Sequence, residues 1–296
     1  MASTLATSEL PGRRVEGWRW SDLQSALKGH QPPLAPGDAH VIARLAEAAG
    51  RKTALTVAPG EHRTLIERLG AGALDAQALE IDVQAGATLS LVMVQSEGEV
   101  ALAHRKIMLG AGSTFRQFIL SEGAKLARIE TDIQIDGAGA SVEMSGVYLA
   151  GAGRHADFTS QVRFDAEGGQ ARQIVRGAAR KGGRGVFQGK FRIGRDGQKT
   201  DAKMAHNALL LEEGAEVFAK PELEIYADDV QCAHGNTNGQ LDEAAVFYLR
   251  QRGLLEVQAR ALITRAFLIE AIPDWLAPEA REQIETRIDA WLGASM

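Results

Sequence analysis

The 296-residue sequence predicts a mainly β protein whose central part is a parallel β-helix, with a short mixed segment before it and a helical domain after it. Between Leu74 and Gly239 long helical periodicity is absent, and short alternating strands follow one another, each punctuated by glycine. Three similar turns, "GATL" at Gly86, "GSTF" at Gly112 and "GASV" at Gly139, recur at intervals of 26 and 27 residues. A loose period of this length in a strand-rich region is typical of the stacked rungs of a solenoid.

A β-sandwich is the competing fold for this central region, because it also gives short strands separated by turn signals. The turn pattern occurs again off the period, in "GAKL" at Gly123 and "GAEV" at Gly214. Pairs such as Asn-Gly and Asp-Gly, which mark tight hairpins between antiparallel strands, are scarce. The drifting interval and the scarcity of hairpin pairs favour the solenoid.

Composition excludes several classes of function. Hydrophobic residues make up 45% of the chain and charged residues 24%, and the net charge is −5, so neither nucleic acid nor an anionic membrane is an expected partner. The first residues lack the apolar core of a signal peptide, and no run approaches membrane-spanning length. The single cysteine, Cys232, cannot form an internal disulfide. We therefore expect a cytoplasmic protein.

The N-terminal region, residues 1–73, is predicted to be mixed. The stretches "WSDLQSALKG" and "DAHVIARLAEAAG" predict short helices, the second capped by Asp38 and ended by Gly50. "RKTALTVAPG" predicts a strand and "GEHRTLIERLG" another short helix. Trp18 and Trp20 could anchor a partner, but we expect them to pack this segment onto its own protein. The central β-helix is assigned to residues 74–239.

Residues 240–296 predict a helical domain. The middle helix, "EVQARALITRAFLIEAI", is apolar on more than one side, so it needs burial on more than one side. Both faces could be buried within this chain, covered by the last helix, "APEAREQIETRIDAWLG". A small domain has few helices that could cover both faces of this helix. We therefore favour a docking surface for another protein, comprising Leu262, Ile263, Ala266, Phe267 and Ile269.

Motifs of self-contained enzymes are missing. "GVFQGKF" and "GRDGQKT" lack the spacing of a phosphate-binding loop, and neither a dinucleotide fingerprint nor a Gly-x-Ser-x-Gly nucleophile elbow is present. No His-Glu-x-x-His spacing occurs. The basic stretch "VRGAARKGGRG" has no interleaved aromatic residues and is interpreted as a solvated turn. We expect a protein that is not an enzyme.

The stretch "EIYADDVQCAHGNT", residues 224–237, is the strongest candidate site. In an extended strand Asp228 and Asp229 would point to opposite faces, so they could not act together on one substrate. Cys232 and His234 would share one face, where a thiol and an imidazole suit iron or zinc, or a nucleophile with its base. The alternatives are a buried cysteine that packs as a small hydrophobe and a turn histidine bonded to backbone.

From Gly185 onward the sequence resembles the SufB/SufD family of iron–sulfur cluster assembly scaffolds. The blocks "QKTDA", "NALLL", "KPELEIYADDV" and "GQLDEAAVFYLRQRG" carry the resemblance, which extends more weakly back to about Leu79. The form "CAHG" is similar to the SufD branch, whereas the SufB branch usually has a Glu-His-Glu run here and a further cysteine motif upstream. Asn236 and Asn238 depart from the family, which commonly has small or aliphatic residues there.

This resemblance implies a right-handed parallel β-helix and a C-terminal helical domain that docks the ATPase SufC. It implies pairing with SufB near the strand that bears Cys232 and His234. A nascent iron–sulfur cluster or iron would be held at that interface, with His234 as the better ligand and Cys232 as the second. This chain alone would hold no cluster, because one thiolate and one imidazole are only part of the usual four ligands. A homodimer is a further possibility.

Two other functions stay open at this point. A β-helical adaptor without a metal role would differ only in what Cys232 and His234 do. A carbohydrate-active β-helix enzyme would need carboxylates spread over several rungs and is usually exported, neither of which the sequence indicates.

Overall fold

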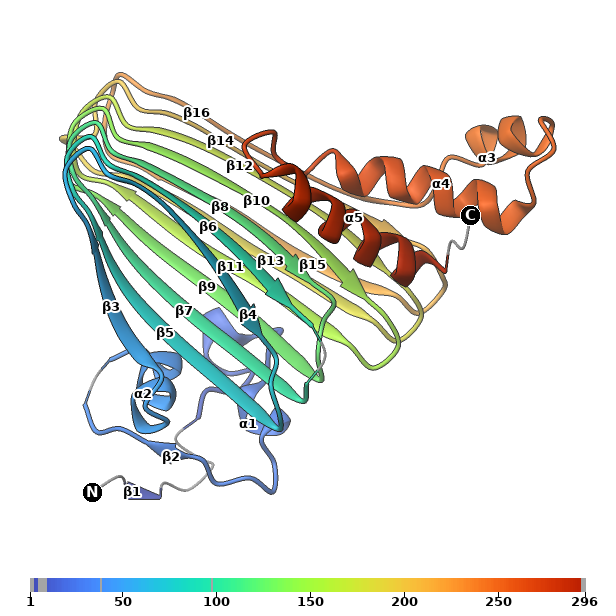
Figure 1. Ribbon diagram of the computed structural model, residues 1–296, viewed down its shortest axis with the longest axis horizontal. Helices are drawn as coiled ribbons and strands as arrows, with labels where there is room; N and C mark the ends of the chain where they lie inside the picture. The colour runs from blue at the N-terminus through green and yellow to red at the C-terminus, as the bar shows by residue number, and fades with distance from the viewer. Residues whose placement is uncertain (1–2, 5–9, 38, 97, 294–296) are drawn as a thin grey trace.

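The computed structural model of the chain describes residues 3–4, 10–37, 39–96 and 98–293. Two long sheets of seven strands each face one another (Figure 1). Every strand in them pairs with its neighbours in parallel, and consecutive strands of the chain alternate between the two sheets. This alternation is that of a parallel β-solenoid. The predicted β-helix is therefore confirmed, and the sandwich alternative is wrong.

One sheet contains the even-numbered strands and is called the even sheet: β4 (His62–Leu69), β6 (Thr88–Gln95), β8 (Thr114–Ser121), β10 (Ser141–Ala150), β12 (Gln170–Ala179), β14 (Asp201–Leu210) and β16 (Gln231–Gly239). The other is called the odd sheet: β3 (Lys52–Val57), β5 (Leu74–Val83), β7 (Val100–Leu109), β9 (Leu126–Ile135), β11 (His155–Phe164), β13 (Arg184–Ile193) and β15 (Glu216–Ile225). The solenoid thus begins at Lys52, inside the predicted N-terminal region.

The prediction of a helix in "GEHRTLIERLG" is wrong, because this segment is strand β4. Its inward-facing Leu65 is half-buried and Leu69 is buried, at a spacing of four residues that fits a strand as well as a helix. Pairing with β6 decides between the two, since it satisfies the backbone and places both leucines over the interior. A tertiary contact overrides the local preference here.

The glycine period follows from the stacking of rungs. Thr88 pairs with Thr114 and Thr114 with Ser141, so these two successive steps of the even sheet are 26 and 27 residues, as the turns predicted. Gly86 and Gly112 lie at the turns before these strands with positive φ, of 67° and 63°, where a side chain would be strained.

The turns that fall off the period lie at the opposite end of the rungs. Gly123 and Gly214 precede the odd strands β9 and β15, also with positive φ, of 70° and 85°. Each rung has two turns, one at either end, and the second set carries its own period. The sequence pattern therefore mixes two interleaved series.

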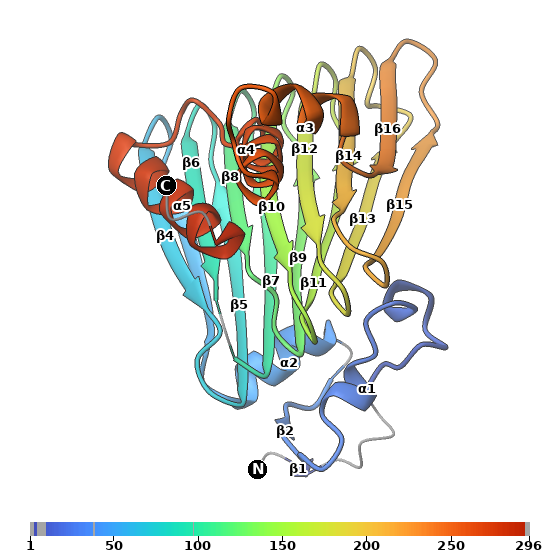
Figure 2. The ribbon, with the colours of Figure 1, turned by 90° about the vertical axis from the view of Figure 1, so that its right-hand side faces the viewer.

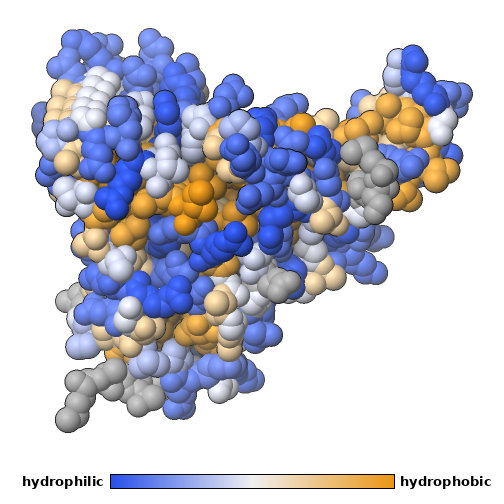
Figure 3. All heavy atoms as spheres, viewed as in Figure 1, coloured by the Kyte–Doolittle hydropathy of each residue, from blue (hydrophilic) through white to orange (hydrophobic). Residues whose placement is uncertain are grey.

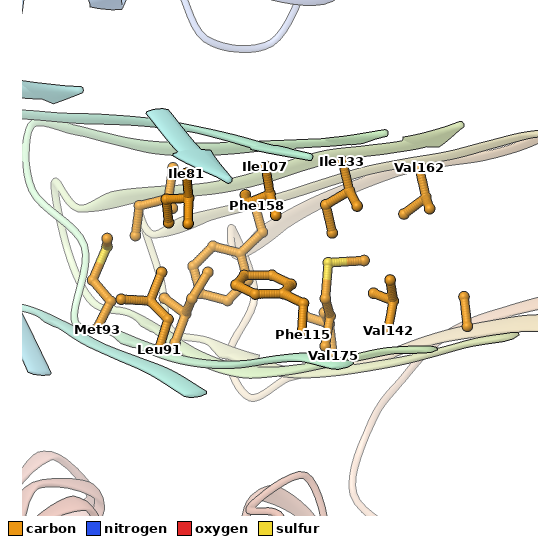
Figure 4. Packing of buried hydrophobic residues seen from close by; sticks show 14 of the residues in the cluster. Ile81, Leu91, Met93, Ile107, Phe115, Ile133, Val142, Phe158, Val162 and Val175 are labelled. Carbon is orange, nitrogen blue, oxygen red and sulfur yellow. The ribbon is translucent and has the colours of Figure 1, made fainter. Parts of the chain in front are cut away.

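The main core fills the space between the two sheets. On the odd sheet Ile81, Ile107, Ile133 and Val162 occupy one register row and form a ladder, and Phe115 and its neighbours on the even sheet face them (Figure 4). All five residues are at most 3% exposed. Full burial of such a side chain contributes about 1.5–3 kcal/mol, so this ladder is a large part of what holds the rungs in register.

The N-terminal segment covers the outer face of the odd sheet (Figures 1 and 2). It comprises β1 (Ser3–Thr4) paired antiparallel with β2 (Pro33–Leu34), a 3-10 turn (Glu16–Trp18), α1 (Leu23–Ala26) and α2 (Val41–Ala48). Both predicted helices are present, and α2 ends before Gly50, which has a φ of 67°. His40 caps α2, and the predicted cap, Asp38, lies outside the described residues. Trp18 is buried and Trp20 stacks on Phe218, so both pack on their own protein as expected.

A buried ion network joins this segment to the solenoid. The guanidinium of Arg128 donates to Asp157 at 2.7 Å and to Glu130 at 2.5 Å, and it lies 4.1 Å from the centroid of Trp18. His40 contacts the second oxygen of Glu130 at 2.9 Å. Burial alone would raise the pKa of Glu130, but the charge of Arg128 and the His40 hydrogen bond outweigh it and lower that pKa to about 2. Glu130 is therefore ionised and paired at neutral pH.

The C-terminal helices are α3 (Glu243–Arg250), α4 (Glu256–Ile269) and α5 (Pro278–Leu292). Helices α4 and α5 lie across the outer face of the even sheet, where Leu268, Ile284 and Ile288 are buried against Phe118 and Val147. No helix among the described residues is long and apolar enough to span a membrane.

Candidate functional site at the terminal rung

The last rung of the solenoid, formed by β15 and β16, is open on one side (Figure 2). Strand β16 pairs with β14 and strand β15 with β13, and neither has a second neighbour in the described part of the chain. Each strand therefore presents a row of unpaired backbone N–H and C=O groups, which is a template for another strand. We call this pair of strands the terminal rung.

The two edges of the terminal rung differ in their readiness to pair. On β15 the N–H of Glu216 donates to the carbonyl of Gly183, on the side of β13. Because N–H groups alternate between the two sides of a strand, an N–H at position 221 would face the open side, and that position is occupied by Pro221. Proline lacks that donor and blunts the edge. On β16 the N–H of Gln231 donates to Thr200, so the N–H groups of the alternate residues starting at Cys232 face outward. No proline interrupts that row.

Cys232 and His234 lie on one face of β16, as their spacing predicts, and the structure shows that this face is the inward one. They stand in register with Ala202 and Met204 of β14, both of which are buried in the interior. Because no further rung in the described part of the chain covers them, Cys232 is only half-buried and His234 is exposed. Burial raises the pKa of the Cys232 thiol, and the charge of Asp201 adds to the effect. The thiol is thus protonated at neutral pH, and a metal ion or partner charge is needed to form the thiolate.

The two aspartates lie elsewhere than expected. Asp228 and Asp229 are in the turn of residues 226–230 between β15 and β16, so the premise of an extended strand is wrong for them. The backbone of Asp229 accepts from Lys199 at 2.6 Å and donates to the Gln198 side chain at 3.0 Å, which fixes the turn. Within the described ranges, no three His, Cys, Asp or Glu side chains gather as a metal-binding group.

Two polar residues behind the site, His206 and Tyr148, are not among those predicted from the sequence. His206 of β14 is fully buried and pairs in register with Asn236, its Nδ1 2.7 Å from the amide oxygen. Its Nε2 lies 3.0 Å from the hydroxyl of Tyr148, which is also fully buried. The sequence signal that could have identified His206 is the two-residue period of side chains along a strand, which places His206 on the same inward face as Ala202 and Met204.

The predicted docking face of α4 is partly used inside the chain. Phe267 and Ile269 are half-buried against the even sheet, with the Arg176 guanidinium 4.5 Å from the Phe267 ring. Ile263 is half-buried beside α3. Leu262 and Ala266 are exposed. Of the five predicted residues, two therefore face solvent.

A larger exposed apolar surface lies on α3 and the start of α4, and of its members only Leu262 belongs to the docking face predicted from the sequence. Its members are Phe247, Tyr248, Leu255, Val257 and Leu262, with 41–74% of each residue exposed. Figure 3 shows hydrophobic residues on this projecting part of the molecule. We call these five residues the α3–α4 patch. Exposed apolar side chains gathered in one place mark interaction surfaces more often than singly scattered ones do.

Comparison with known proteins gives a consistent family. Residues 40–267 match the family description "SUF system FeS cluster assembly, SufBD core domain". The chain is 29% identical to the iron–sulfur cluster assembly protein SufD of Escherichia coli over 240 residues, which is 79% of this chain and 57% of that protein. It is 28% identical to a SufBD family protein of Mycobacterium leprae, covering 78% and 61% of the two chains. It is 33% identical to Protein ABCI7, chloroplastic, of Arabidopsis thaliana, covering 72% and 46%. The chain spans roughly half to three-fifths of the length of these relatives.

Proposed function

This chain belongs to the SufBD family of iron–sulfur cluster assembly proteins, and on that premise we propose that it is a SufD-like scaffold subunit rather than an enzyme. Its partners in this proposal are a SufB-like protein and a SufC-like ATPase. The observation that carries the proposal is the terminal rung, which combines an unpaired strand edge with a half-buried thiol and an exposed imidazole on one face.

Pairing through β16 is supported by its backbone. A partner strand added to this edge would satisfy the outward N–H groups, and edge-strand addition is a common mode of recognition. The same partner would cover half-buried apolar residues at the end of the interior, among them Val217, Leu223 and Val230. The blunted edge of β15 leaves β16 as the strand that pairs.

The substrate of the site in this proposal is a nascent iron–sulfur cluster or its iron. Thiolate and imidazole are suitable ligands for iron, and a cluster generally takes four ligands. Cys232 and His234 would supply one half, His234 being the more accessible, and the SufB-like partner the other half. The raised pKa of Cys232 fits a thiol that becomes a ligand only on assembly.

Docking of the SufC-like ATPase is assigned to the C-terminal helices, through the α3–α4 patch together with Ala266. Leu268 on the other side of α4 is buried against the even sheet, so a displacement of α4 acts directly on the solenoid. In this mechanism, ATP binding draws the ATPase subunits together, and the helices transmit that movement to the paired solenoids. The interface then opens and admits iron and sulfide to Cys232 and His234.

The experiment is co-purification with the SufB-like and SufC-like proteins, followed by anaerobic reconstitution with ferrous iron and sulfide and by absorbance spectroscopy. His234→Ala should leave the complex intact and abolish the cluster signal. An unchanged cluster in that variant would make this chain an adaptor without a metal role.

A matched pair of proline variants tests the edge itself. Asn238→Pro removes an outward N–H and should abolish pairing with the SufB-like protein while the chain stays folded. Thr237→Pro removes an N–H directed to β14 and should destabilise the chain itself. Retention of the pairing in the Asn238 variant would exclude β16 as the interface strand.

A further inference from the structure

A hydrogen-bonded chain of three side chains runs from the interior of the solenoid to the terminal rung. The hydroxyl of Tyr148 lies 3.0 Å from Nε2 of His206, and Nδ1 of His206 lies 2.7 Å from Oδ1 of Asn236. The His206 ring stacks on Phe187 with 4.9 Å between centroids and 3° between planes. Tyr148 and His206 have no solvent exposure, whereas Asn236 is exposed on β16.

The inner end of this chain is held rigidly. A Cβ at Gly177 would lie 1.9 Å from Tyr148 Cζ, and one at Gly185 would lie 2.3 Å from Tyr148 Cε2. The two glycines therefore provide the space that the tyrosine ring fills, one from each sheet. Because the ring cannot shift, the position of its hydroxyl, and through it that of His206, is fixed.

The direction of each hydrogen bond follows from the groups present. The amide oxygen of Asn236 only accepts, so Nδ1 of His206 donates to it. A neutral imidazole carries one proton, so Nε2 accepts from the Tyr148 hydroxyl. Burial lowers the pKa of His206 to about 4, partly offset by the Asn236 hydrogen bond, which agrees with a neutral ring. Tyr148 has no second hydrogen-bond partner in the described residues, so this chain orients groups and does not conduct protons to solvent.

The outcome is a fixed amide at the surface. With its oxygen bound to His206, Asn236 directs its two N–H donors away from the interior, to the open side of β16. Along the strand it lies two residues, about 6.6 Å, from His234 on the same face. Exposed amide N–H groups at this open edge can donate hydrogen bonds to an anionic acceptor.

We propose that His206 is a positioning residue that orients the Asn236 amide to donate hydrogen bonds to anionic sulfur, either sulfide or thiolate, held at the terminal rung. This inference rests on the proposed function, which places a sulfur-containing substrate there. Hydrogen bonds to the sulfur atoms of a cluster change its reduction potential. A hydrogen bond to a charged group is worth about tenfold or more in an equilibrium constant.

The test compares four variants in the complex reconstituted with ferrous iron and sulfide. Asn236→Ala removes the donor and His206→Leu removes its orienting partner, and each should accelerate cluster loss to a chelator about tenfold and shift the midpoint potential to a more negative value. His206→Asn keeps a donor at the Nδ1 position and should restore native behaviour. Gln231→Ala, on the opposite face of the same strand, is the matched control and should stay within about twofold of native.

A readout on the isolated full chain is independent of any cluster. Nitrogen-15 NMR should find His206 protonated at Nδ1 and unprotonated at Nε2, and His206→Leu should release the Asn236 side-chain amide. An Nε2-protonated ring, or native retention and potential in Asn236→Ala, overturns this inference and leaves the proposed function standing. A native complex that holds no cluster refutes the proposed function, and this inference with it.

Discussion

Replacing Arg128 by methionine should detach the N-terminal segment from the solenoid. Arg128 is 2% exposed and pairs with Asp157 and Glu130, which are 1% and 6% exposed. Methionine preserves most of the volume but leaves two buried carboxylates without their shared cation. Removing one partner of a buried ion pair costs about 3–5 kcal/mol, and the lost contact with the Trp18 ring adds about 1 kcal/mol.

Local detachment of the N-terminal segment costs less free energy than unfolding of the whole chain. Asp157 and Glu130 regain water as soon as the segment that bears Trp18 and His40 lifts off, whereas unfolding the whole chain would sacrifice the interior ladder as well. We therefore expect amide hydrogen exchange in α2 to rise by two or more orders of magnitude while exchange in the central strands changes little.

Two controls identify the cause. Lys125→Met, at an exposed pair with Glu99, should change the free energy of unfolding by less than about 1 kcal/mol. Converting Arg128, Asp157 and Glu130 together to apolar residues should recover much of the loss, because no charge is then stranded. Equal exchange in α2 for the Arg128 and Lys125 variants would refute the view that the network holds the segment.

Three further predictions concern the stability of the solenoid. Gly177→Ala should destabilise the chain by about 3 kcal/mol or more in urea unfolding, since its Cβ would overlap the Tyr148 ring, and a wild-type midpoint would contradict the close approach. Burial, together with nearby arginines, lowers the pKa of His155 to about 3, and burial lowers that of His206 to about 4, so only the unfolded chain takes up these protons below pH 6.5. The free energy of unfolding should therefore fall by about 2.7 kcal/mol per pH unit between pH 6 and 4.5, and His206→Asn should halve that slope; an unchanged slope would count against the buried neutral ring. Phe118→Ala should cost about 3–5 kcal/mol and loosen α4 and α5, as increased proteolysis of the C-terminal helices would show; wild-type resistance would exclude this packing.

The solenoid could be predicted from sequence because glycine reports a backbone conformation directly. The turns at Gly86 and Gly112 need positive φ whatever surrounds them, so the spacing of these glycines in the sequence gives the number of residues in a rung. The segment of β4 could not be predicted in the same way, because its leucines fit a helix and a strand equally well. Only the pairing with β6 distinguishes the two, and pairing is not a local property.

The candidate site was predictable in part for a similar reason. If the segment is a strand, the spacing of Cys232 and His234 determines that their side chains lie on the same face. That β16 is the last strand, and so exposes them, depends on where the chain turns into α3. The contribution of His206 depends on Tyr148, 58 residues earlier, and on the glycines that make room for it. No local pattern contains that relationship.

The rungs also grow along the solenoid. In the odd sheet the register advances by 26 residues at each of the first three steps, then by 29 twice and finally by 32. The first rung has strands of six and eight residues and the last has strands of ten and nine. A stack with equal ends could add copies head to tail without limit, and heterologous contacts of that kind produce filaments. Because the perimeter of this stack changes from one end to the other, its ends do not match each other. Repeated head-to-tail addition of copies of this chain is therefore disfavoured.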